Sequence, residues 1–174
     1  MSRVRSSLFL ALMFLGVIPM NLSAAPPAKR GCQFIPFNSF ASFTRSPGTN
    51  VHETILTSPE IQTRIRWDEL IASWNVEMKS AAALRVEVRA IYPDHTTKWF
   101  TMGLWSADPA KHPRKSVRGQ RDADGDVDTD TLVLKQPTER VQIRVILSSG
   151  GKHKPKLKFL SMSLLDSKAG REPL

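Results

Sequence analysis

The sequence contains very little cysteine and lacks the short motifs that mark common enzyme sites. Cys32 is the only cysteine among 174 residues, so no disulfide can form within one chain. The apolar segment Leu8–Ile18 is shorter than the roughly 20 residues that a permanent membrane anchor needs. No Gly-x-Ser-x-Gly, His-Glu-x-x-His or phosphate-binding glycine loop is present, and no internal repeat is visible. The fold must therefore depend on side-chain packing alone.

The amino terminus has the three parts of a secretory signal peptide. Arg3 and Arg5 precede the apolar segment, and small residues around Ala24 follow it. The sequence thus predicts a signal peptide over residues 1–24 and a secreted or periplasmic protein, with an uncleaved anchor as the alternative. After cleavage we expect no transmembrane segment.

The remaining chain is long enough for one domain with a proper core. The signal peptide carries two of the 25 Lys and Arg residues, which leaves 23 basic residues against 16 acidic ones, a formal charge of +7. We divide the rest of the chain into a linker over residues 25–36, a domain over residues 37–166 and a carboxy-terminal tail over residues 167–174.

Alternation of apolar and polar residues predicts short strands along most of this domain. The pattern is clear in Ile61–Trp67, Leu84–Ala90 and Val141–Leu147. Trp99–Trp105 and Leu132–Leu134 are apolar on both faces, as expected for central strands, and weaker strands are predicted over Phe37–Phe43 and Val51–Thr57. A change of phase near Phe159 or Leu160 indicates a β-bulge. Together the strands predict an all-β domain, an antiparallel β-sandwich of the jelly-roll or galactose-binding-like kind.

One segment allows a second interpretation. Trp67, Leu70, Ile71 and Trp74 follow a helical spacing within residues 67–78. We predict a strand followed by a loop there, because the neighbouring segments are strands and Ser73-Trp74-Asn75 is typical of a turn.

Three segments resemble the amino-terminal β-sandwich that precedes the catalytic domain in some secreted bacterial cysteine peptidases similar to family thirty-nine, the bacteriocin-processing type. The segments are Thr57–Pro59 with Leu70–Asn75, then Lys98–Trp105, and then Ser116–Leu132 with its Gly-Gln…Asp-Gly…Thr-Asp-Thr signature. They span roughly residues 55–165. The resemblance implies an accessory β-sandwich and transfers no catalytic residue, because the catalytic domain would follow it.

An aspartate stands at every second position from Asp122 to Asp130. If the loop curls, Asp122, Asp124 and Asp126 could converge on Ca²⁺, which prefers six to eight oxygen ligands. The alternative is a turn in which aspartate side chains accept hydrogen bonds from their own backbone. We favour the turn, because the loop supplies too few ligands and lacks a bidentate glutamate at its end. Beyond possible Ca²⁺, no cofactor is predicted.

Basic side chains fall on the predicted solvent faces of three strands. These residues are Arg64, Arg66, Arg85, Arg89 and Arg144. If the strands are neighbours, they form a cationic face suited to an anionic polysaccharide or another envelope polymer, although a merely soluble surface is the simpler alternative. Nucleic acid is not expected as a partner, because the protein is predicted to be exported and carries no recognition motif.

Tryptophans offer a further contact surface for sugar rings. Trp74 is the best candidate, because it lies in the predicted loop. Core packing is nevertheless the favoured interpretation for Trp67, Trp74, Trp99 and Trp105, given the area that a buried tryptophan removes from water.

The sequence therefore predicts a secreted, non-catalytic module that binds anionic or carbohydrate envelope polymers and is associated with a cysteine-peptidase architecture. A truncated or divergent hydrolase using Cys32 is one alternative, since histidines are available as bases. A structural spacer without a ligand is the other.

Overall fold

The computed structural model describes residues 31–79, 81–110, 114–150 and 153–169. Within these ranges the chain forms nine strands and no helix, so the all-β prediction is confirmed. Accordingly, none of the described segments is a helix with the length and hydrophobicity that a membrane crossing requires. The predicted signal peptide lies outside the described residues, and so does the tail from residue 170 onward.

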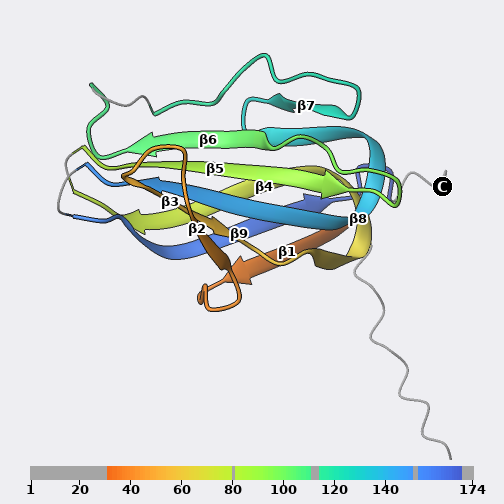
Figure 1. Cartoon of the computed structure of the whole chain (residues 1–174). Helices are drawn as coiled ribbons and strands as arrows, with labels where there is room; N and C mark the ends of the chain where they lie inside the picture. The colour runs from red at the N-terminus through yellow and green to blue at the C-terminus, as the bar shows by residue number, and fades with distance from the viewer. Residues whose placement is uncertain (1–30, 80, 111–113, 151–152, 170–174) are drawn as a thin grey trace, which may run out of the picture.

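All strand pairs are antiparallel and belong to one strongly curled sheet (Figure 1). The strands are β1 (Cys32–Phe37), β2 (Thr44–Pro47), β3 (Glu53–Thr57), β4 (Ile61–Glu77), β5 (Ala83–Ile91), β6 (Phe100–Ser106), β7 (Gly125–Asp128), β8 (Thr131–Ser148) and β9 (Lys156–Leu165). One layer contains β1, β9, β4, the first half of β8 and β7. The other contains β6, β5, the second half of β8, β3 and β2. The curled sheet thus makes the two facing layers of the predicted sandwich.

β8 joins the two layers because it bends in the middle. Figure 1 shows it turning at one end of the molecule, from the side of β7 toward β5 and β3. Pro137 lies at this bend, where the pairing of β8 with β4 is irregular, and proline has no N–H to donate to a sheet. Side chains hold the corner in place. Thr138 Oγ1 donates to Ile91 O at 2.6 Å, Tyr92 Oη to Gln136 O at 2.6 Å, and Thr63 Oγ1 to Glu139 O at 2.8 Å.

The core lies between the two layers. Its fully buried side chains include Leu132, Leu160 and Met162 from the first layer, and Val86 and Ile143 from the second. They belong to one contiguous cluster, so each layer covers the apolar face of the other. Alternation in the sequence predicted the inward positions of Val86 and Ile143 correctly.

Several predicted boundaries are wrong. Cys32–Phe37 is strand β1 rather than the end of a linker, because it pairs with β9 along its whole length. The strand predicted over Phe37–Phe43 ends at Phe37. After it, the Phe43 amide donates to Phe40 O in a turn. The Phe43 ring then packs edge-to-face against the rings of Phe37 and Phe40. Burial of these rings, rather than strand pairing, decides the local conformation.

The segment after Trp67 is also different from the prediction. β4 continues without a loop from Ile61 to Glu77, and it pairs with β9 over its second half. The bulge predicted near Phe159 is confirmed one residue earlier. Asn75 opposes Phe159 while Val76 opposes Leu157, so Lys158 is the extra residue.

β6 is an edge strand rather than the central strand predicted from its apolar sequence, since it pairs only with β5. Its free edge is covered by the segment that follows it. Leu104 and Lys115 exchange backbone hydrogen bonds of 3.1 and 3.3 Å. The Gln120 side chain accepts from the Thr101 amide at 2.7 Å and donates to Thr101 O and Val117 O at 2.8 Å. A glutamine amide thus replaces a missing neighbouring strand at this edge.

We expect Gln120→Ala to lower the free energy of unfolding by about 1–3 kcal/mol, because it leaves backbone groups of the edge strand unpaired. Urea unfolding measures the change. The matched control is Gln136→Ala, which removes an exposed amide and leaves its bonded backbone oxygen in place. Equal effects of the two substitutions would contradict this role of Gln120.

Candidate functional site

Three of the five predicted arginines lie together on the outer face of the second layer. Arg85 and Arg89 extend from β5, and Arg144 extends from the neighbouring half of β8. Glu87 opposes Arg144 directly, and Arg89 opposes Gln142. Directly opposed residues of an antiparallel pair share one face of the sheet, so the register brings these side chains into contact.

Trp99 lies at the centre of this group, just before β6. The guanidinium carbon of Arg144 is 4.2 Å from the ring centroid, and that of Arg89 is 4.7 Å away. We call these three residues the arginine–tryptophan cluster. The prediction that Trp99 belongs to the core is wrong, because the ring is half-buried on the outer face. Thr101 opposes Glu87 and therefore shares its outer face. Trp99 is two residues from Thr101, so the alternation of the strand places Trp99 on the same face.

Glu87 connects the arginines through a buried carboxylate whose side chain is 8 % exposed. Arg144 Nε is 2.5 Å from Oε2, and Arg85 Nε is 2.9 Å from Oε1. Arg89 Nε donates to Gln142 Oε1 at 2.9 Å. A buried ion pair fixes geometry more than it adds stability, while loss of one partner costs roughly 3–5 kcal/mol. Glu87, which alternation alone did not single out, therefore orients two of the three arginines.

The other two predicted arginines are elsewhere. Arg64 and Arg66 are exposed on the irregular part of β4, between the regular pairs at Gln62 and Trp67. The Arg64 amide donates to Gln33 Oε1 at 2.7 Å, which places this residue beside β1. The prediction of one continuous cationic face from all five arginines is therefore wrong, since β4 and β5 are not neighbours.

Trp74 does not lie in an exposed loop, as predicted, but in β4. Its half-buried ring packs across the sandwich against β6. A Cβ added to Gly103 would be 2.7 Å from Trp74 Cη2, so glycine makes room for the indole. Trp74 and Trp105 line a shallow hollow of about 410 Å³ at this end of the molecule. Trp105 is 40 % exposed, with Arg114 4.4 Å above its ring, so its predicted core position is wrong as well.

The acidic loop is a hydrogen-bonded turn. Asp122 Oδ1 accepts from the amides of Asp124 and Gly125 at 2.9 and 3.0 Å, and Oδ2 is 3.1 Å from Lys98 Nζ. Partial burial raises the pKa of Asp122, but the two amides and Lys98 outweigh burial, and the pKa is lowered overall. Of the two interpretations of this loop, the geometry supports the turn.

The other two candidate ligands, Asp124 and Asp126, contact different side chains. Asp124 Oδ1 is 3.0 Å from His95 Nε2, and Asp126 Oδ2 is 3.1 Å from Arg121 Nε. Among the described residues, no group of three His, Cys, Asp or Glu side chains is placed to hold a metal ion. Asp122, Asp124 and Asp126 thus do not converge, because each is paired separately.

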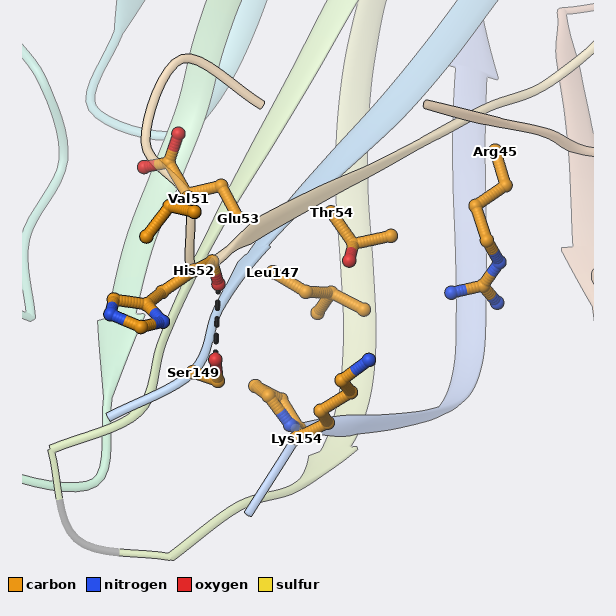
Figure 2. A pocket seen from close by; sticks show the side chains of 9 residues that line it. Arg45, Val51, His52, Glu53, Thr54, Leu147, Ser149 and Lys154 are labelled. Atoms are coloured by element: carbon orange, nitrogen blue, oxygen red, sulfur yellow. Dashed lines mark hydrogen bonds between the residues drawn. The ribbon is translucent and has the colours of Figure 1, made fainter. Parts of the chain in front are cut away.

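A smaller hollow of about 190 Å³ lies beside the β2–β3 hairpin (Figure 2). Figure 2 shows Lys154 extending toward the side of Arg45, while the His52 imidazole lies at the opposite end. Ser149 Oγ donates to His52 O at 3.1 Å. Because the basic groups do not converge on one point, this hollow is a weaker candidate than the arginine–tryptophan cluster.

Cys32 is exposed at the start of β1, at the edge of the sheet. Within the described ranges, no hydrogen bond joins it to a histidine, and His95 is engaged by Asp94 and Asp124. This placement gives no support to a cysteine hydrolase.

We expect calcium to leave the thermal stability unchanged. Melting of the protein in ~1 mM Ca²⁺ and in excess chelator should give midpoints within about 1 °C of each other, because ligand binding raises stability only where a site exists. A higher midpoint in calcium that Asp122→Asn abolishes would contradict the separate pairing of the loop carboxylates.

The pKa of His95 should lie above 6.5, because hydrogen bonds to Asp94 and Asp124 favour its charged form. The interaction is therefore complete below pH 6.5 and is lost as the pH rises through the higher pKa of the folded state. A titration followed by NMR of the imidazole measures the midpoint. In Asp94→Asn the midpoint should move down toward 6.5, and an unchanged midpoint would contradict the assignment.

Comparison with known protein families identifies the family of this chain. The family described as Peptidase C39 N-terminal domain matches residues 42–164, which is most of the chain. No curated protein matches the sequence, and no solved structure does. The matched range contains every residue of the arginine–tryptophan cluster and of the acidic loop. The chain belongs to the Peptidase C39 N-terminal domain family.

Proposed function

We propose that this domain is an exported, non-catalytic module that binds an acidic envelope polysaccharide through the arginine–tryptophan cluster. The family connects the chain to a C39-type peptidase architecture. In that setting the module would hold the peptidase close to the cell envelope. The observation that carries the proposal is the contact of Arg89 and Arg144 with one tryptophan ring.

The chemistry of the cluster suits a sugar ring that carries a carboxylate or phosphate. A guanidinium binds planar oxyanions through paired hydrogen bonds, and the Trp99 ring holds the guanidiniums of Arg89 and Arg144 side by side for such a contact. The internal bonds of Arg85, Arg89 and Arg144 come from Nε. Each terminal Nη group carries two hydrogens, so these groups retain the capacity to donate to a ligand.

Charge supports the same class of ligand. The whole chain has a formal charge of +9, and Glu87 compensates only part of the positive charge around Trp99. A cationic surface raises the local concentration of a polyanion, and this attraction weakens as salt screens it. The exposed Arg64 and Arg66 would add to this general attraction without touching the same sugar unit.

Retention on immobilised polymers tests the proposal. The wild-type domain should be retained on a uronic-acid polysaccharide at ~0.05 M salt and released by ~0.5 M, because the Debye length shortens from roughly 14 to 4 Å. A neutral glucan should not retain it. Arg89→Gln should weaken binding about tenfold, since a hydrogen bond to a charged group contributes about 1.5 kcal/mol or more.

Lys79→Gln is the matched control, because it also removes one positive charge. Lys79 is exposed before the start of β5, whereas Arg89 lies near the end of that strand. Circular dichroism verifies that both variants are folded. Equal retention of the two variants would show that overall charge, rather than Arg89 itself, causes the binding. Retention that does not change with salt concentration would contradict the proposal.

A further inference from the structure

Four of the six large apolar side chains that are exposed in the described residues gather on one surface. Phe34, Ile71, Val133 and Leu165 are 56, 41, 39 and 40 % exposed. They come from the four neighbouring strands β1, β4, β8 and β9, which form the layer opposite the arginine–tryptophan cluster. A large apolar patch on a soluble protein marks a contact site more often than a single exposed side chain does.

The strand register places these four residues on the same side of the sheet. One row runs from Cys32 through Leu165 and Glu69 to Val133, since each residue opposes the next. The adjacent row runs from Phe34 through Ser163 to Ile71. Opposed residues share a face, and so do residues two positions apart on a strand. We call this surface, defined by Phe34, Ile71, Val133 and Leu165, the apolar face.

Charged side chains of both signs surround the apolar face. Glu69 lies in its first row, and the rows continue onto β7 with Asp126 and Asp128. Arg118, Arg121 and Lys135 lie around the same hollow as Val133, and Arg121 pairs with Asp126. An apolar centre with a charged rim of mixed sign is the composition of a protein contact rather than of a polyanion site.

The chain leaves the domain at the edge of the same face. Leu165 ends β9, and the next residue is bound to the residue before β1, because the Asp166 amide donates to Gly31 O at 2.9 Å. Ser167 then donates from its amide and its hydroxyl to the buried Asp68, both at 2.8 Å. Polypeptide that follows the domain thus starts from a fixed point beside the apolar face.

We infer that the apolar face is the docking surface for a C39-type peptidase domain. The inference rests on the proposed role as an accessory module of that architecture. The family description places this domain on the amino-terminal side, so a peptidase in the same chain would follow β9, and the connection to it would start beside Leu165. A tether raises the local concentration of a joined domain, so even a modest apolar contact can be occupied.

Cys32 supplies a reporter for this contact. It is exposed, and it opposes Leu165 at the edge of the apolar face. The probe is the purified peptidase domain of a protein that contains both this N-terminal domain and a C39-type peptidase, added in trans or fused after Leu174. Docking should slow alkylation of the Cys32 thiol at least fivefold and slow amide hydrogen exchange along the outer edge of β1.

Ile71→Lys tests the surface directly, because it places a charge at the centre of the apolar face without altering the core. It should weaken binding of the peptidase at least tenfold and restore fast alkylation of Cys32. Val51→Lys is the matched control. Val51 is 91 % exposed in the loop before β3, so the same change in charge and size should leave docking unchanged.

Three outcomes would overturn the inference. The first is a Cys32 alkylation rate that the peptidase does not change. The second is equal binding by Ile71→Lys and Val51→Lys. The third is concentration-dependent dimerisation of the free domain that Ile71→Lys abolishes, which would make a second copy the occupant. Polymer retention distinguishes a failure of peptidase docking from a failure of polysaccharide binding. Ile71→Lys should bind the polysaccharide like the wild type, and Arg89→Gln should still bind the peptidase domain.

Discussion

The bend in β8 is the constraint on which the rest of the structure depends, because this one strand pairs with β3, β4, β5 and β7. Its two halves belong to different layers, so the sandwich closes only if the strand turns at a defined residue. Pro137 interrupts the ladder there, and the corner is held by short hydrogen bonds from Thr138, Tyr92 and Thr63. Desolvation and the nearby Asp124 raise the pKa of Tyr92 to about 12, so the hydroxyl keeps the proton that it donates to Gln136 O. The position of Arg144 opposite Glu87 follows from this geometry.

The outer surfaces of the two layers are chemically different. One carries arginines around Trp99, oriented by the buried carboxylate of Glu87. The other carries apolar side chains with charged neighbours of both signs, next to the point where the chain leaves the domain. Such a division would allow one domain to contact a polyanion on one side and a protein on the other.

The residues that carry the family resemblance act mainly on the fold. Gln120 substitutes for a missing strand beside β6, and Asp122 accepts two backbone amides. Gly125 has no room for a side chain, since a Cβ would lie 2.5 Å from Val133 O. Thr129 adopts φ of 60° in the two-residue connection between β7 and β8. The signature therefore shapes a covering segment and a hairpin rather than a ligand site.

The alternation of side chains determined the clearest strands, the inward residues of β5 and the outward phase of every predicted arginine, because a period of two is a local property of an extended chain. The resemblance was also read from short segments, of which Leu70–Asn75 lies within β4 and Ser116–Leu132 forms the covering segment and the hairpin. Only the tertiary structure decided which arginines meet. Arg85, Arg89 and Arg144 lie together because β5 pairs with β8, whereas Arg64 and Arg66 lie on an irregular part of β4. It also moved Trp99 outward and Trp74 inward, because the place of each ring depends on the strand across from it, such as the glycine that faces Trp74.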